Sequence, residues 1–181
     1  GRIGWVPTNG SFQAFVTGLR VQLGEDVARD WLEGIAANDP EEYPNNIAAV
    51  QAVADGEVDV AFVNHYYLFQ IREDRGDVPV ANHYLSNGDP GALVNVAGVG
   101  VLSSSDDQDL ALEFVRYLLS TEAQQYFADE TFEYPLSLTA DVEPIADLPP
   151  LAELEPPDLD LSSLSDLEGT LEMLRETGVL P

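Results

Sequence analysis

The stretch Val58–Phe69, VDVAFVNHYYLF, joins an apolar run to two adjacent tyrosines. Its first half, Val58–Val63, predicts a strand buried on both faces, because almost every residue in it is apolar. The polar Asn64 marks a turn or a cap, and a helix is expected from about His65 to Asp74. A buried strand that leads directly into a helix is typical of an α/β protein with a mainly parallel sheet.

The segments before this stretch follow the same order of strand and helix. Arg2–Val6 predicts a short strand, Pro7–Gly10 supplies turn residues, and Ser11–Leu23 carries apolar residues at helical spacing. A further helix is expected over Ile47–Ala54, with Asn46 as its N-cap. The alternation extends the predicted parallel sheet to the start of the chain.

The segments after this stretch predict more elements of both kinds. Ala81–Leu85 and Leu93–Leu102 are expected to be strands, and the second is long enough to pass between two lobes. Three polar caps predict the starts of helices: Ser103–Asp106, Thr121, and Ser162 or Ser163.

Acidic residues dominate the charge of the chain. Its 181 residues include 33 Asp plus Glu and 7 Lys plus Arg, which gives a net charge of −26, and every basic residue is an arginine. Binding to nucleic acid requires clustered basic residues, so that class is excluded, and the same lack argues against docking to an anionic membrane. Arginine in place of every lysine favours a protein of a high-salt organism, since concentrated salt screens the repulsion among carboxylates.

Other features of the composition exclude further kinds of site. Cysteine is absent, so disulfides, thiolate metal sites and cysteine nucleophiles are excluded. No apolar run is long enough to cross a bilayer, and the first residues lack the charged and apolar regions expected of a signal peptide. The chain begins without Met in a strand-like run, so it is expected to be a processed or trimmed piece of something longer.

The adjacent Tyr66 and Tyr67 lie in the first turn of a predicted helix, directly after a strand. Ligands bind at the carboxyl ends of strands in open α/β sheets, so both phenol groups could contact the same ligand there. Phenolate is a hard oxygen ligand, and Fe³⁺ is the hard cation that best lowers the phenol pKa from about 10. The alternative is a pair of core aromatics whose hydroxyls bond to the backbone. The residues alone leave both interpretations open.

The turn at Asn9–Ser11 lies between a predicted strand and a predicted helix. The first N–H groups of a helix have no partner inside it, and they and the helix dipole favour an anion at this position. Most strand–turn–helix units bind nothing, so the pattern alone is a weak signal.

The whole chain resembles the C-terminal part of the ferric-ion-binding proteins, the iron-delivery components of ABC importers in the type II periplasmic-binding-protein superfamily. The matching stretches follow one another in the family's order. They are PTNGSF (Pro7–Phe12), WLEGI (Trp31–Ile35), YPNNIAAVQAVADGEVDVAFVNHYY (Tyr43–Tyr67), DPGALVNVAGVGVL (Asp89–Leu102), ALEFVRYLLSTEAQQYF (Ala111–Phe127) and EYPL (Glu133–Leu136). The resemblance implies an α/β fold of two lobes, with the second lobe and part of the first in this chain.

The resemblance also implies the ligands of the transported ion. Tyr66 and Tyr67 match the paired tyrosines that bind Fe³⁺ in the family. The family usually adds a histidine and a carboxylate from the first lobe, which would be encoded before residue 1. His65 stands where the family often has asparagine and is expected to be a solvated or capping residue, with a ligand role as the minority alternative. His83 is expected to lie in a surface loop.

An anion that binds together with the iron is implied in the same way. Asn9, Gly10 and Ser11 match the loop that holds a synergistic anion such as phosphate or carbonate. Asn46 and Asn64 match asparagines that help to bind it. Some members place a tyrosine in the first loop and need no anion. This loop has no tyrosine, so the anion-dependent variety is favoured.

The implied architecture divides the chain into three parts. Residues 1–96 are expected to form the second lobe, residues 97–146 to cross to the first lobe, and the acidic, proline-rich residues 147–181 to return to the second. The implied protein is an extracytoplasmic monomer and not an enzyme. It captures Fe³⁺ in the cleft between the lobes and delivers it to the membrane permease of an ABC importer.

Three other functions stay open at this point. A receptor of the same fold for an anion or a small organic solute would use the two tyrosines to stack on its ligand. A metal-independent hydrolase would need a nucleophile and a base, and only His65 and His83 are available as histidine bases. A purely structural or interaction module is the third.

Overall fold

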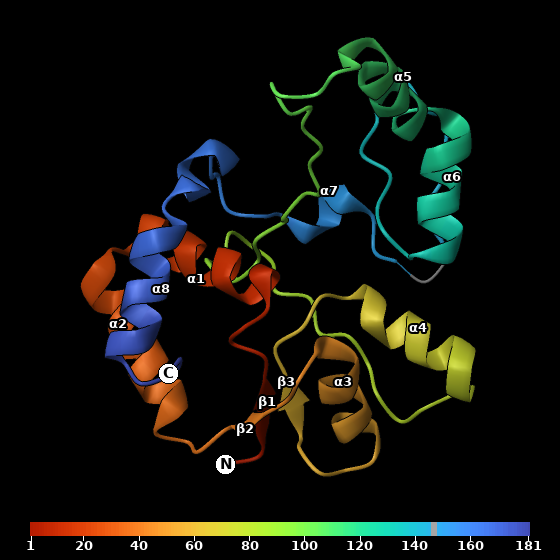
Figure 1. Cartoon of the computed structure of the whole chain (residues 1–181). Coiled ribbons are helices and arrows are strands. Elements are labelled where there is room, and N and C mark those ends of the chain that lie inside the picture. Colours follow the sequence, from red (N-terminus) through yellow and green to blue (C-terminus); the bar gives the residue numbers. More distant parts are fainter. Residues whose placement is uncertain (146–147) are drawn as a thin grey trace. The chain divides into compact units, whose positions relative to one another are not determined.

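Residues 1–145 and 148–181 are described by a computed structural model, which divides into two compact units (Figure 1). The first unit joins Gly1–Asn95 to Ala152–Pro181, and the second holds Val96–Leu151. The predicted boundary at residues 146 and 147 lies outside the described residues. The assignment of residues 1–96, 97–146 and 147–181 to two lobes stays a prediction.

The first unit is built on a small parallel sheet. Its strands are β1 (Ile3–Trp5), β2 (Glu41–Glu42) and β3 (Val60–Ala61), in the order β2-β1-β3. Both neighbours run parallel to β1, with Gly4 opposite Glu41 on one side and Ile3 opposite Val60 on the other. The predicted parallel pairing is therefore confirmed. Because the strands are parallel, their carboxyl ends meet at one edge of the sheet.

Each strand leads towards a helix that begins just beyond that edge (Figure 1). These helices are α1 (Gly10–Leu23), α3 (Asn46–Ala54) and α4 (Tyr66–Arg75), and α2 (Glu25–Ala36) lies between α1 and β2 in the chain. The returning segment adds α7 (Leu151–Leu154), a 3₁₀ helix (Leu161–Ser165) and α8 (Leu167–Glu176). None of the helices among the described residues is long and apolar enough to span a bilayer.

Two apolar clusters hold these helices in place. The larger one joins Trp5 of β1 to α1, α2 and α8, with Leu32 and Leu174 fully buried at its centre. The smaller one joins Val50 of α3 to Leu68 and Ile71 of α4. In Figure 1, α1, α2 and α8 lie to one side of the strands and α3 and α4 to the other. The sheet is thus fixed from both sides, and so are the helix starts at its carboxyl edge.

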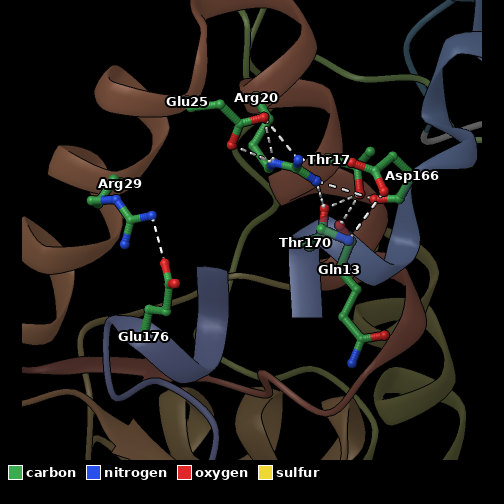
Figure 2. Close-up of polar contacts among 9 residues, drawn as sticks. Gln13, Thr17, Arg20, Glu25, Arg29, Asp166, Thr170 and Glu176 are labelled. Carbon is green, nitrogen blue, oxygen red and sulfur yellow. Dashed lines mark hydrogen bonds and ion pairs between the residues drawn. The ribbon is translucent and has the colours of Figure 1, made fainter. Parts of the chain in front are cut away.

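A polar cluster around Arg20 joins α8 to α1 (Figure 2). The Arg20 guanidinium donates to Glu25, to Oδ2 of Asp166 at 2.8 Å and to Oγ1 of Thr170 at 2.7 Å. The Thr170 hydroxyl also lies 2.7 Å from that of Thr17, and both threonines are buried. Charge-assisted hydrogen bonds of this kind are stronger than neutral ones, so the cluster ties the C-terminal helix to α1.

The Arg20 cluster predicts a dependence of stability on pH. Hydrogen bonds from Arg20 lower the pKa of the Glu25 and Asp166 carboxyls below their ordinary values. A lowered folded-state pKa stabilises the protein above the unfolded-state value of about 4, and this stabilisation is lost as the pH falls through the folded-state pKa. We expect Arg20→Met to lower the midpoint of urea unfolding at pH 7, and its difference from the wild type to shrink towards pH 3.

Urea titrations followed by circular dichroism, at fixed molar NaCl and several pH values, measure this difference. Arg175→Met is the matched control, because Arg175 is an exposed arginine on the same helix α8. A deficit of Arg20→Met that stays constant from pH 7 to pH 3 would contradict the role assigned to the two carboxylates.

The second unit contains α5 (Gln108–Leu118) and α6 (Thr121–Glu130). Not one residue of α5 is buried, although its sequence is strongly amphipathic. Leu110 is 60% exposed and Phe114 is 58% exposed. Exposed apolar side chains in such a row mark a contact surface rather than an ordinary solvated face.

Several predicted elements differ in the structure. The strand expected over Val58–Val63 is reduced to β3, and its Val60 is 48% exposed rather than buried, because β3 is an edge strand among the described residues. The runs Ala81–Leu85 and Leu93–Leu102 are not strands, since no neighbour among the described strands pairs with them. Conversely, β2 forms from Glu41 and Glu42, a segment for which the sequence predicts no strand.

The helix caps are shifted by one or more residues from their predicted positions. The N-cap of α3 is Asn45 rather than Asn46, that of α5 is Asp107, and that of α6 is Ser120 rather than Thr121. Asp166 caps α8, which begins later than Ser163. An N-cap must have a non-helical backbone from which its side chain can reach an amide two or three residues ahead. Runs of polar residues leave the choice among neighbours open.

Candidate functional site

The carboxyl edge of the sheet collects the candidate residues from three loops. Asn9, Gly10 and Ser11 follow β1, Asn46 follows β2, and Asn64 with the tyrosine pair follows β3. All three loops leave the same edge because the strands are parallel and adjacent. Open α/β sheets bind their ligands at this position.

The loop after β1 is closed by its own hydrogen bonds. The side chain of Asn9 is the N-cap of α1 and accepts a hydrogen bond from the amide of Ser11 at 2.9 Å. The backbone N–H of Asn9 donates to the carbonyl of Val6, and the side-chain amide of Gln13 donates to the carbonyl of Pro7. Gly10 is exposed, and a Cβ built on it would meet nothing within 4 Å. The loop is therefore ordered, with open space above Gly10.

The loop after β2 brings one asparagine to the helix start and buries the next. Asn45 accepts a hydrogen bond from the amide of Ala48 at 2.9 Å and so takes the capping role predicted for Asn46. Asn46 is the first residue of α3 and only 3% exposed. A buried amide at this edge suits a structural or binding role better than a cap.

The loop after β3 carries the tyrosine pair. Tyr66 and Tyr67 open α4, and their ring centroids lie 4.6 Å apart with the planes at 50°. Tyr67 packs on the smaller apolar cluster, whereas Tyr66 faces the imidazole of His65 edge-on at 5.4 Å. Adjacent helical side chains normally diverge, and the contact between these rings shows that the helix start holds them together.

Asn64, which precedes this pair, has a buried polar atom without a partner. Its Oδ1 is buried and accepts no hydrogen bond from the described residues. Leaving a buried acceptor unpaired costs about 1–3 kcal/mol, so such atoms are rare and call for an explanation. An asparagine amide offers a carbonyl oxygen and an NH₂ group in the same volume, so it can turn either one to a ligand.

Two further residues near the pair, Asn82 and Tyr84, were missed in the sequence. The side-chain amide of Asn82 donates to the carbonyl of His65 at 2.9 Å and to the hydroxyl of Tyr84 at 3.3 Å. Both side chains are half-buried, while Ala81, His83 and Leu85 are exposed. Burial raises the pKa of the Tyr84 phenol, and the hydrogen bond from Asn82 opposes it. The alternation of exposure along this segment is visible only in the structure, so the sequence alone offered no signal for Asn82 and Tyr84.

Carboxylate and imidazole groups form no metal site of their own in the described parts of the chain. Over residues 1–145 and 148–181, no three His, Asp or Glu side chains lie close enough together to hold a metal ion. His83 is exposed, as expected for a surface loop.

Comparisons with known proteins agree with this arrangement. Residues 1–161 match the family described as bacterial extracellular solute-binding protein. The major ferric iron-binding protein of Neisseria meningitidis serogroup B is 35% identical over 180 residues, which cover 98% of this chain and 54% of that protein. The Fe(3+)-binding periplasmic protein of Serratia marcescens is 31% identical over 99% of this chain and 53% of its own length.

Solved structures show the same fold. Iron-bound HitA from Pseudomonas aeruginosa superposes with a TM-score of 0.91 at 39% identity, over 98% of this chain and 57% of that one. Apo FutA2 from Synechocystis superposes with a TM-score of 0.77 at 28% identity, over 99% of this chain and 60% of that one. The predicted type II periplasmic-binding-protein fold is confirmed. The chain spans about half the length of the curated relatives it matches.

The matched family binds solutes for transport and is not a family of enzymes. With the match over residues 1–161 and the shared fold, the chain belongs to the bacterial extracellular solute-binding proteins, and its relatives include ferric-ion-binding members.

Proposed function

We propose that the protein captures Fe³⁺ through Tyr66 and Tyr67, together with a synergistic anion, as the substrate-binding component of an ABC importer. The observation that carries this proposal is the contact between the two phenol rings at the carboxyl edge of the sheet. The two neighbouring rings each carry a phenol oxygen, a hard ligand that suits a hard trivalent cation, and such a cation favours the deprotonated form. The names of the relatives, which bind ferric iron, support the same ion.

The anion in this proposal lies among the helix starts at the same edge. Asn9, Gly10 and Ser11 supply the first turn of α1, with open space above Gly10. Asn46 and Asn64 complete the group. The unpaired Oδ1 of Asn64 is an acceptor, so the Asn64 amide would turn its NH₂ group to the anion. Phosphate or carbonate would offset part of the charge of Fe³⁺ and fill coordination positions that the two phenolates leave open.

The wider setting of the proposed function follows from the family and from the second unit. The protein acts outside the cytoplasm as a monomer, in a high-salt organism, and passes the ion to a membrane permease. Residues 97–146 belong to a first lobe whose remaining part would cover α5. The exposed apolar row on α5 supports this, because it needs a partner surface.

The test is a titration of the natural protein, over its full length, with a soluble ferric chelate in molar NaCl. Bound Fe³⁺ should give the visible absorption band of a tyrosinate-to-iron charge transfer. We expect the band to appear in the presence of phosphate or carbonate, and the iron to be lost faster to a competing chelator when both anions are removed. The absence of any band would overturn the iron proposal.

The anion assignment has its own control. Asn64→Leu removes the amide beside the tyrosine pair and is expected to weaken the dependence of iron retention on phosphate. Asn45→Leu is unsuitable as a comparison because it removes a helix cap, so Asn38→Leu, at an exposed position after α2, is the matched control. Retention that is identical with and without anion would refute the anion part alone.

A receptor for an anion or a small organic solute remains an outcome of the same experiment. In that case the anion would bind without iron and would quench or shift tyrosine fluorescence, and no visible band would form.

A further inference from the structure

An extended segment after α4 runs back along that helix towards its first residue. The Arg72 guanidinium of α4 donates to the carbonyl of Val80 at 3.1 Å. Two residues further, the side-chain amide of Asn82 donates to the carbonyl of His65 at 2.9 Å. The segment is therefore attached to α4 at two points, and the second lies at the very start of the helix.

The bond from Asn82 acts on the peptide unit that leads into the tyrosine pair. The carbonyl of His65 and the amide nitrogen of Tyr66 belong to one planar group, so their orientations cannot change independently. His65 is the residue before α4, and its side chain makes no capping hydrogen bond. A hydrogen bond to this carbonyl therefore restricts the direction in which Tyr66 leaves the backbone.

Tyr84 supports Asn82 in this position. The second N–H of the Asn82 amide reaches the Tyr84 hydroxyl at 3.3 Å, which leaves the amide little freedom to turn. The Tyr84 ring lies 6.4 Å from that of His65, which in turn lies 5.4 Å from Tyr66. Aromatic contacts at these separations each contribute a modest stabilisation, so the rings form a continuous row beside the pair.

We propose that Asn82 is a positioning residue for the tyrosine pair: it holds the His65 carbonyl and thereby the orientation of Tyr66, while Tyr84 holds the Asn82 amide. This inference rests on the proposed function, in which the pair binds Fe³⁺. Asn82 does not touch the ion. Its contribution is to keep the two phenols in the relative orientation that iron requires before the ion arrives, which lowers the cost of ordering them on binding.

The test compares Asn82→Leu with Asn38→Leu in the full-length natural protein. Asn38 also donates its side-chain amide to a backbone carbonyl, that of Gly34 at 2.7 Å, but at the far end of α2. We expect Asn82→Leu to shift or weaken the tyrosinate-to-iron band and to release iron to a chelator about three to ten times faster, as the loss of one hydrogen bond implies. Asn38→Leu should match the wild type in both readouts.

Tyr84→Phe separates positioning from direct ligation. The variant keeps the bond from Asn82 to His65 and is expected to retain the band and to release iron less than about three times faster. Loss of the band in Tyr84→Phe would make Tyr84 a ligand and would overturn the proposal. Asn82→Ala, which removes the amide without adding an apolar side chain, gives the same test if the leucine variant does not fold.

The outcomes for the two proposals are distinct. A wild-type protein without the band refutes the proposed function and, with it, this inference. A wild-type protein with the band, together with an Asn82→Leu variant that matches Asn38→Leu in band and release rate, refutes the positioning role alone.

Discussion

Replacing Tyr66 or Tyr67 with phenylalanine is expected to remove most of the visible tyrosinate-to-iron band and to weaken ferric binding by about a hundredfold or more, since even the loss of a residue behind a ligand costs up to that factor. Each variant keeps the ring packing but removes one of the two phenol oxygens. The ion then has one phenolate ligand fewer, and the charge-transfer band depends on these phenolates. The double variant should give no band.

The measurement is a ferric titration in molar NaCl with phosphate present, followed in the visible range and by competition with a chelator. Tyr126→Phe is the matched control, because Tyr126 is 59% exposed on α6 and lies in the second unit. Colourless binding of iron to the acidic surface would persist in all variants, so the band and not the total iron is the criterion. An unchanged band in both single variants would assign the pair to the core.

Raising NaCl from about 0.05 M to about 1 M is expected to increase the free energy of unfolding by several kcal/mol, because the Debye length falls to about 3 Å at 1 M and repulsion among the carboxylates is screened. The chain has 33 acidic residues against 7 basic ones. Arg2, Arg20, Arg29 and Arg75 are paired with carboxylates. Most acids therefore repel one another, and the folded state brings them closer together.

Urea unfolding at several NaCl concentrations tests this expectation, and α8 provides the control. Glu168, Glu172 and Glu176 follow one another at four-residue spacing on the exposed face of this helix. Glu172→Gln removes the middle charge, so it should stabilise the protein by about 0.5 kcal/mol at low salt and by much less at 1 M. A stability independent of NaCl would refute the high-salt interpretation, and a rise that never levels off would indicate salting-out instead of screening.

Local sequence supplied the candidate residues of the site, and the family resemblance supplied their expected roles. Adjacent tyrosines after a strand, and an Asn-Gly-Ser turn before a helix, are short patterns whose chemistry depends on residue type and on the helix start. The helices α1 and α4 form almost where their spacing predicts, because apolar residues three and four apart face the two apolar clusters. Local propensity and burial agree in these segments.

The extended segments were harder to interpret. Residues 93–102 were predicted to be a strand. A run of small apolar residues specifies only an extended backbone, because the hydrogen bonds of a strand depend on a neighbouring strand. Glu41–Glu42 carries no apolar signal, yet it pairs with β1. Asn82 lies in the run Ala81–Leu85 that was expected to be a strand, and its partner, the carbonyl of His65, is seventeen positions away in the chain. No local pattern encodes such a pairing.

Residue type alone specified the phenol groups of the tyrosine pair, the acidic charge of the chain and the positions of α1, β1 and α4 to within a few residues. Tertiary structure decided which loops share an edge, because only parallel pairing of β2, β1 and β3 brings their carboxyl ends together. It also decided that Asn45 caps α3 while Asn46 is buried, and that Asn82 holds the peptide before Tyr66. The physical reason is that charge and ligand chemistry belong to single side chains, whereas register, capping and positioning depend on atoms that come from distant parts of the chain.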